Sequence, residues 1–248
     1  MTITAQEALE ALNFGSVDAE SEKDLSEKFL KTNDFKLFID PNTSLILGPK
    51  GSGKSAIFEL ITKYEFTARS WAGAALDNVL LAEATGFRDL SEIDTSTIEE
   101  LQKNPDFGYP KLWEIYFSIK LATKLSQAGI KTKGASSLLL KQLGKSPDYR
   151  LLPLAKTLWG KIFGKVPKKV NIPFIGEINI GSTIASVSTN EVLQDISSTL
   201  TKQNKEAWLI FDKIDEIFPM SPNNRAEALS HLMQTSMECR KKYPNIKF

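Results

Sequence analysis

The sequence predicts an α/β protein with a three-layer α/β/α core, in which helices cover both faces of a parallel sheet. Two local patterns and the composition predict this fold class. A glycine-rich loop lies between a short apolar run and a helical pattern, and a second apolar run far downstream ends in an acid. The 248 residues are 42% hydrophobic and 25% charged, which is ordinary for a folded globular chain.

The chain begins with an acidic segment, residues 1–41, that we expect to be partly helical. Residues 1–30 carry a net charge of −5, and Leu25, Phe29 and Leu30 share one side of a helical pattern. A short apolar approach follows, and Asp40 and Pro41 end it. Because a proline disfavours helix in the residue before it, this dipeptide separates the lead-in from the next element.

The glycine-rich loop has the pattern G-x-x-x-x-G-K-S, which is the phosphate-binding loop of nucleoside triphosphatases. Residues 43–47 before it read as a short buried strand, and Ile57, Leu60, Ile61 and Tyr64 after it form one apolar face of a helix. Such a loop points backbone N–H groups and a helix N-terminus at phosphate oxygens. Lys54 is expected to reach the β- and γ-phosphates, and Ser55 to ligate Mg²⁺. The predicted nucleotide-binding residues are Gly48, Pro49, Lys50, Gly51, Ser52, Gly53, Lys54 and Ser55.

Residues 67–189 are interpreted as an insertion between two parts of the core, 42–66 and 190–248. A helix is expected near 111–127, a basic and mostly helical stretch after it, and a β-hairpin near 170–188, where isoleucines alternate with glycine and proline. Residues 131–170 have a net charge of +9. This segment is either a solvated lysine face or a contact surface for nucleic acid.

The second apolar run, Glu206 to Phe211, precedes Asp212 and reads as another buried strand. A helical stripe before it is expected to be capped by Thr189 or Asn190. A further helix is expected over residues 223–242, followed by the start of a strand at Ile246. We expect this strand to continue, and therefore the 248 residues to be the N-terminal part of a longer protein.

The acids after the second strand predict the chemistry of the site. Asp212 is expected at the carboxyl edge of the sheet, where α/β proteins bind ligands, as a ligand of Mg²⁺. Glu216, or alternatively Asp215, is expected to activate the attacking water. The motifs that read guanine are incomplete in this sequence, which favours ATP.

The string Leu209-Ile210-Phe211-Asp212-Lys213-Ile214-Asp215-Glu216 resembles the extended acidic motif of STAND-class proteins, especially NACHT proteins, and is similar to the D-D-h-D motif of KAP-type NTPases. Lys213 replaces the small or acidic residue of those motifs. Together with residues 48–57 and the lead-in residues 15–20, the chain resembles a bacterial P-loop ATPase family related to KAP and STAND proteins, often found in antiviral defence.

The resemblance implies an ATP-driven switch or an oligomeric ATPase that controls an effector domain in the same polypeptide. It also implies a sensor residue on the strand that begins at Ile246 and an arginine supplied by a neighbouring subunit, for which Arg225 and Arg240 are candidates. A competing hypothesis is a module that holds ATP without turnover and contacts nucleic acid through residues 131–170.

The remaining features of the sequence exclude several classes of protein. No apolar stretch is long enough to span a membrane, and the N-terminus lacks the basic region of a signal peptide. One cysteine, Cys239, excludes a disulfide framework, and one histidine, His231, excludes histidine-rich metal sites. A cytoplasmic location is expected.

Overall fold

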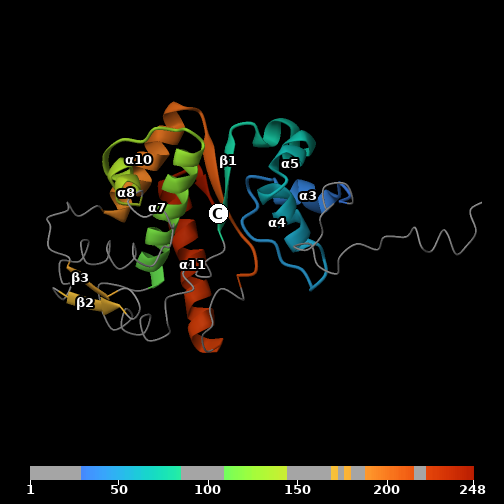
Figure 1. The fold of residues 1–248 in the computed structure, drawn as a ribbon. Helices are drawn as coiled ribbons and strands as arrows, with labels where there is room; N and C mark the ends of the chain where they lie inside the picture. Colours follow the sequence, from blue (N-terminus) through green and yellow to red (C-terminus); the bar gives the residue numbers. More distant parts are fainter. Residues whose placement is uncertain (1–28, 85–108, 144–168, 173–175, 180–187, 215–221) are drawn as a thin grey trace, which may run out of the picture. The chain divides into compact units, whose positions relative to one another are not determined.

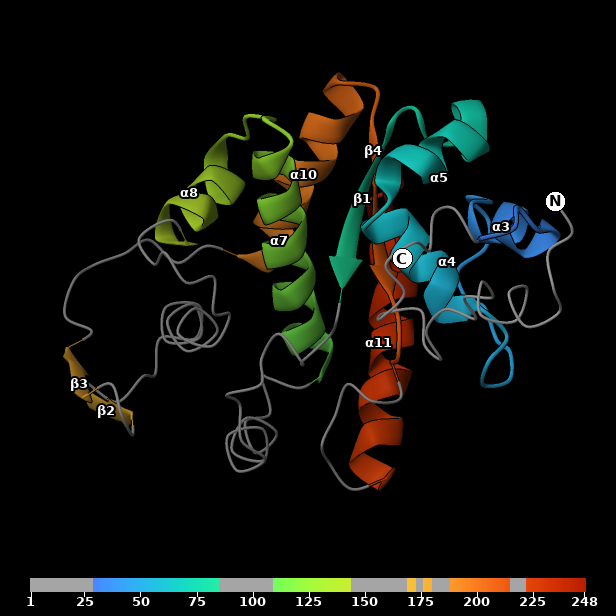
Figure 2. The ribbon, with the colours of Figure 1, turned by 45° about the vertical axis from the view of Figure 1, so that its right-hand side comes forward.

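The computed structural model describes residues 29–84, 109–143, 169–172, 176–179, 188–214 and 222–248 (Figure 1). The chain divides into two units, Met1–Asp77 and Asn78–Phe248, and each is described by itself. Figure 2 shows the same elements from a second direction.

The first unit contains three helices and a short 3-10 turn in its described part. They are α3 (Asn33–Phe38), α4 (Lys54–Thr62), α5 (Glu65–Ala72) and the 3-10 turn Gly73–Leu76. The predicted apolar face of α4 is confirmed, since Ile57, Leu60 and Ile61 are buried. The helix ends at Thr62, so Tyr64 lies beyond it as the residue before α5. Phe35 of α3 is fully buried, with its ring edge-on to Trp71.

The predicted strand at residues 43–47 is wrong, because these described residues form no strand. A strand is stabilised by its ladder partners more than by intrinsic preference. Residues 43–47 pair with no strand of the described sheets. Their side chains are accordingly exposed, to 44% at Leu45 and 83% at Leu47.

A three-stranded parallel sheet forms the centre of the second unit. Its strands are β1 (Val79–Ala84), β4 (Glu206–Phe211) and β5 (Ile246–Lys247), in the order β1-β4-β5. All six residues of β4 pair in register with β1, and Ala207 pairs with Ile246. The strands predicted at 206–211 and from 246 are therefore confirmed. The central strand is buried over Ala207–Leu209, as expected for a strand with a parallel neighbour on each side.

The strand β1 was not predicted, because the sequence interpretation assigned residues 67–189 to an insertion. Its sequence, Val-Leu-Leu-Ala-Glu-Ala, is a short apolar run that periodicity cannot distinguish from buried helix. Pairing with β4 decides its conformation.

The described part of the second unit also has four helices (Figure 1): α7 (Tyr109–Gln127), α8 (Gly134–Leu143), α10 (Thr189–Lys202) and α11 (Pro222–Lys242). The helices α7, α10 and α11 contact the strands, and α8 packs against α7 and α10. The helices predicted at 111–127 and 223–242 are confirmed. Residues on almost every side of α7 are buried, so the helix runs through the core and has no wide polar face. Its aromatic residues are all buried: Tyr109, Trp113, Tyr116 and Phe117.

The helix α10 begins one or two residues earlier than predicted, with Ser188 as its N-cap in place of Thr189 or Asn190. The carboxylate of Glu191 accepts a hydrogen bond from the backbone N–H of Ser188 at 3.3 Å. The sequence S-x-x-E at 188–191 is the capping-box pattern that could have located this start.

A two-stranded antiparallel sheet, β2 (Lys169–Ile172) and β3 (Gly176–Asn179), lies where the sequence predicts a hairpin. The described structure is thus α/β, with one parallel sheet and one antiparallel pair. None of its helices, within the residues described, is both long and apolar enough to cross a membrane.

Candidate functional site

The predicted phosphate-binding loop has the backbone geometry that its glycines permit. Gly51 has φ +83° and Gly53 has φ +86°, values that L-residues adopt only at a cost because Cβ crowds the following carbonyl. Gly53 is the N-cap of α4, so the helix begins at Lys54. The loop therefore leads directly into a helix N-terminus, where backbone N–H groups lack partners within the helix.

Lys54 is folded back over the loop. Its ammonium donates hydrogen bonds to the carbonyl oxygen of Gly48 at 2.6 Å, that of Pro49 at 2.8 Å and Oγ of Ser52 at 3.1 Å. A lysine ammonium has three donors, and all three are used within the loop. The positive charge is thus held against the first two residues of the loop and Ser52.

The first glycine of the loop is close to this arrangement. A Cβ built on Gly48 would lie 2.8 Å from Oγ of Ser52 and 3.7 Å from Nζ of Lys54. The loop closes tightly at this point because no side chain intervenes. Ser55, the predicted Mg²⁺ ligand, follows in the first turn of α4 and is partly buried.

Asp212, the other predicted Mg²⁺ ligand, follows β4 directly at the carboxyl end of the central strand. The residue before it is anchored: the ring of Phe211 lies 6.2 Å from Trp113, 6.1 Å from Tyr116 and 6.3 Å from Phe117, measured between centroids. Asp212 is partly buried. Aromatic packing therefore positions the backbone that carries this carboxylate.

The two halves of the predicted site belong to different units. Gly48–Ser55 lie in Met1–Asp77 and Asp212 lies in Asn78–Phe248, so the local geometry of each half is described separately. Asp215 and Glu216, the residues predicted to activate water, lie outside the described residues.

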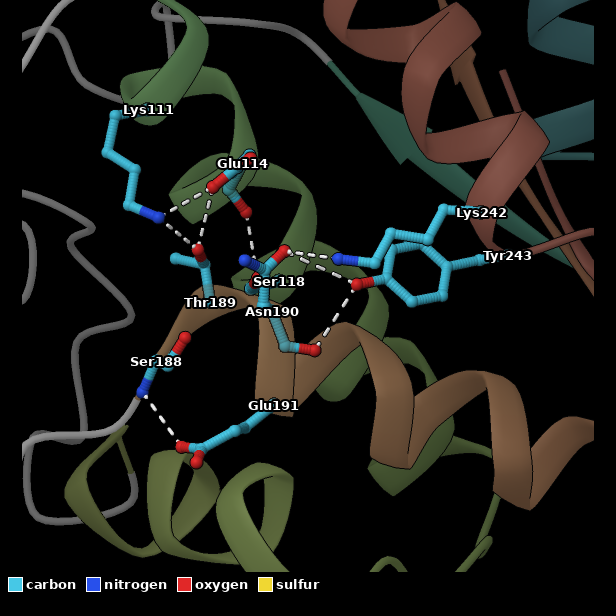
Figure 3. Close-up of polar contacts among 9 residues, drawn as sticks. All are labelled: Lys111, Glu114, Ser118, Ser188, Thr189, Asn190, Glu191, Lys242 and Tyr243. Carbon is cyan, nitrogen blue, oxygen red and sulfur yellow. Dashed lines mark hydrogen bonds and ion pairs between the residues drawn. The ribbon is translucent and has the colours of Figure 1, made fainter.

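A polar cluster at the start of α10 was missed by the sequence interpretation (Figure 3). The hydroxyl of Thr189 donates to Oε2 of Glu114 at 2.7 Å, and Nζ of Lys111 donates to both, at 2.6 Å and 2.7 Å respectively. Thr189 is buried, and Lys111 and Glu114 are about three-quarters buried. Only the fold could reveal this cluster, because Thr189 is 75 or more positions from Lys111 and Glu114 in the chain.

The same region also connects α10 to the end of α11. The hydroxyl of Tyr243 donates to the backbone oxygen of Asn190 at 3.3 Å, and Nζ of Lys242 donates to its side-chain oxygen at 3.1 Å. Burial raises the pKa of Tyr243 above its ordinary value, which keeps the hydroxyl protonated as a donor. These contacts fix the position of the α10 N-terminus, and we interpret the cluster as structural.

Cys239 and His231 both lie on α11 and do not form a nucleophile with its base. Burial raises the pKa of the Cys239 thiol to about 12, so the reactive thiolate is disfavoured. The His231 ring stacks on Tyr109 at 6.0 Å between centroids. Among the residues that the structure describes, no group of three or more histidine, cysteine or acidic side chains is arranged to hold a metal ion.

The two candidate arginines also lie on α11. Nε of Arg225 is buried without a hydrogen-bond partner among the described residues, and the charge of Arg240 contributes to lowering the pKa of Glu206 at the start of β4. Burial is described for three lysines of the basic segment, Lys131, Lys133 and Lys141, and all three are exposed.

Comparison with known proteins covered family models, curated sequences and solved structures. No family model matches this chain, and neither a curated protein nor a solved structure is significantly similar to it.

Proposed function

We propose that this chain binds Mg²⁺-ATP through residues 48–55 and hydrolyses it as the switch or motor domain of a larger effector protein, with a role in antiviral defence as its resemblance implies. The observation that carries the proposal is the conformation of the loop. Two glycines with positive φ lead into a helix N-terminus, and the lysine that follows them is held over the loop. A glycine-rich surface turn with an incidental lysine has no reason to combine these features.

Each residue has a separate role in this proposal. Backbone N–H groups at the start of α4 would hold phosphate oxygens, and Lys54 would exchange its contacts with Gly48 and Pro49 for the β- and γ-phosphates. Ser55 and Asp212 would supply oxygen ligands, which Mg²⁺ prefers. Glu216, with Asp215 as the alternative, would orient and deprotonate the attacking water.

Binding is tested with the Lys54→Ala variant of the complete chain. We expect its affinity for Mg²⁺-ATP, measured by isothermal titration calorimetry, to fall by at least tenfold, since a charge-assisted contact is worth about 1.5–3 kcal/mol. Lys63→Ala is the matched control. It removes the same charge just beyond the other end of α4, where Lys63 pairs with Glu59 at 2.6 Å. Equal affinities of the native chain and Lys54→Ala would refute the role of the loop.

Metal dependence and turnover are tested separately. Asp212→Asn should weaken nucleotide binding in the presence of Mg²⁺ and have little effect in EDTA. Glu216→Gln should retain ATP binding and lose phosphate release, because only the group that activates water is removed. Phosphate release at the native rate would show that Glu216 is not the base.

The alternative function, contact with nucleic acid without turnover, is favoured by the exposure of Lys131, Lys133 and Lys141. If these lysines contact phosphates, the affinity for a single-stranded oligonucleotide should fall steeply as salt rises. Absence of binding at 50 mM salt would remove this alternative.

A further inference from the structure

Ser52 lies in the middle of the loop and contacts two of the groups that close it. Its Oγ accepts a hydrogen bond from Nζ of Lys54 at 3.1 Å, and its backbone N–H donates to the carbonyl oxygen of Pro49 at 3.2 Å. The same Pro49 oxygen also accepts a hydrogen bond from Nζ of Lys54, at 2.8 Å. Ser52, Pro49 and the Lys54 ammonium are therefore joined in a closed ring of hydrogen bonds.

The backbone places the Ser52 side chain against the start of the loop. Ser52 lies between Gly51 and Gly53, whose φ values of +83° and +86° turn the chain on both sides of it. A Cβ on Gly48 would lie 2.8 Å from Oγ of Ser52 and 3.5 Å from its Cβ. A side chain at position 48 would thus push the serine hydroxyl away, so the first glycine of the motif leaves room for it.

The three acceptors that Lys54 contacts differ in kind. Two are backbone carbonyl oxygens, those of Gly48 and Pro49, which other residues at these positions would also offer. The third is the hydroxyl of Ser52, and the pattern G-x-x-x-x-G-K-S leaves residue 52 unspecified. The serine therefore adds a contact to Lys54 that the phosphate-loop motif does not require.

This contact is suited to hold the lysine ready for a ligand. A lysine side chain is long and flexible, and it loses rotamer freedom when its ammonium is fixed on a ligand. A contact that already holds the ammonium in the loop reduces this loss on binding. When Lys54 exchanges its contacts with Gly48 and Pro49 for phosphate oxygens, the hydroxyl of Ser52 is the acceptor that stays with it.

We propose that Ser52 is a positioning residue, whose hydroxyl holds the Lys54 ammonium in the loop before and during its contact with the phosphates of ATP. This role rests on the proposed function, since Ser52 acts through Lys54 on the same site. All of the contacts that support it lie within residues 48–55 of the first unit.

Binding of Mg²⁺ with the β,γ-imido analogue of ATP to the complete chain, measured by isothermal titration calorimetry, tests this role. Ser52→Ala should weaken binding about fivefold, which corresponds to one hydrogen bond of about 1 kcal/mol. It should fold as the native chain does, because Ser52 is exposed. Ser52→Thr should keep most of the affinity because it keeps the hydroxyl.

Thr62→Val is the matched control for loss of a hydroxyl. Thr62 is the last residue of α4, and its Oγ1 donates to the carbonyl oxygen of Phe58 at 2.9 Å. This variant removes a hydroxyl from the same helix at the end away from the loop, so the affinity for the ATP analogue should not change.

A double-mutant cycle distinguishes positioning of Lys54 from a direct contact between Ser52 and phosphate. If Ser52 acts through Lys54, Ser52→Ala should cause no further loss of affinity in the Lys54→Ala background. Losses that add would show that the hydroxyl acts without the lysine, and they would refute the positioning role.

The reactivity of Lys54 gives a second measurement, made without nucleotide. Acetylation by sulfosuccinimidyl acetate, followed by mass spectrometry, should be faster at Lys54 in Ser52→Ala than in the native chain, because the ammonium is held less firmly in the loop. Lys50, which is exposed in the same loop, should react equally in both chains. Equal rates at Lys54 would show that the hydroxyl does not hold it.

Failure of this role and failure of the proposed function give different results. If the native chain binds the ATP analogue and Ser52→Ala binds it equally well, the role of Ser52 is overturned and the proposed function stands. If the native chain does not bind the analogue, the proposed function fails, and the role of Ser52 fails with it.

Discussion

Gly129, which follows α7, and Gly134, the first residue of α8, allow backbone strain to be separated from a side-chain contact. Gly129 has φ +70° and Gly134 has φ +64°. A Cβ on Gly129 would meet nothing within 4 Å, whereas a Cβ on Gly134 would lie 2.6 Å from Oδ2 of Asp195. The same oxygen accepts a hydrogen bond from the backbone N–H of Ser136, at the start of α8, at 3.2 Å.

Alanine at the two positions should therefore destabilise the protein by different amounts. Gly129→Ala should cost about 1–2 kcal/mol of unfolding free energy, from the left-handed backbone alone. Gly134→Ala should cost about 2–4 kcal/mol, because the displaced carboxylate also loses its hydrogen bond to Ser136, a contact to a charged group worth about 1.5 kcal/mol or more.

The assay is urea unfolding followed by circular dichroism, with the change read from the midpoint at constant m-value. In the Asp195→Ala background there is no carboxylate to displace, so Gly134→Ala should cost only about 1–2 kcal/mol, as Gly129→Ala does. Equal costs for Gly129→Ala and Gly134→Ala in the native background would refute the role of the Asp195 contact.

Three further predictions concern single side chains. Trp113→Phe should destabilise the protein by about 1–3 kcal/mol and speed amide exchange in α11, because the fully buried indole donates a hydrogen bond to the α11 backbone at 3.0 Å; unchanged exchange would contradict this. Burial opposes ionisation of Glu206, but hydrogen bonds from Lys247 and Trp208 and the charges of Lys247 and Arg240 together outweigh it, so the pKa of Glu206 lies below the ordinary 4.5. The native chain should therefore have a higher urea unfolding midpoint than Glu206→Gln. This difference should be fully present above about pH 5 and should decline as the pH falls through the lowered pKa of Glu206. A difference that stays constant down to pH 2 would contradict this prediction. The pKa of Cys239, the one cysteine in the chain, is about 12. Its thiol should therefore react with Ellman's reagent at pH 8 far more slowly in the folded chain than in urea. Equal rates would show that the thiol is accessible in the folded chain.

Where a pattern is local, it predicted the structure. The apolar run before Asp212 became the central strand, and the helices expected at 111–127 and 223–242 appear with ends within two residues of those expected. The helical stripe expected before that strand lies in α10. Each of these elements is indicated by its own local sequence, either by helical periodicity or by a turn residue at its end.

The sequence alone did not predict the conformations that depend on a partner distant in the chain. Residues 43–47 and 79–84 are both short apolar runs, yet only the second forms a strand, because it pairs with β4 along its full length. The contact of Thr189 with Glu114 could not be foreseen either, since these residues are brought together only by helix packing.

By itself, the sequence of this protein determined the phosphate-loop motif, the acid that follows the central strand and most of the helices, because each depends on residues that are neighbours in the chain. Tertiary structure decided which apolar runs pair as strands, how the α10 N-terminus is held and that Lys213 is placed in a left-handed turn next to Asp212. The physical reason is that strand pairing, buried polar contacts and backbone strain are set by groups far apart in sequence, whose positions only packing of the core specifies.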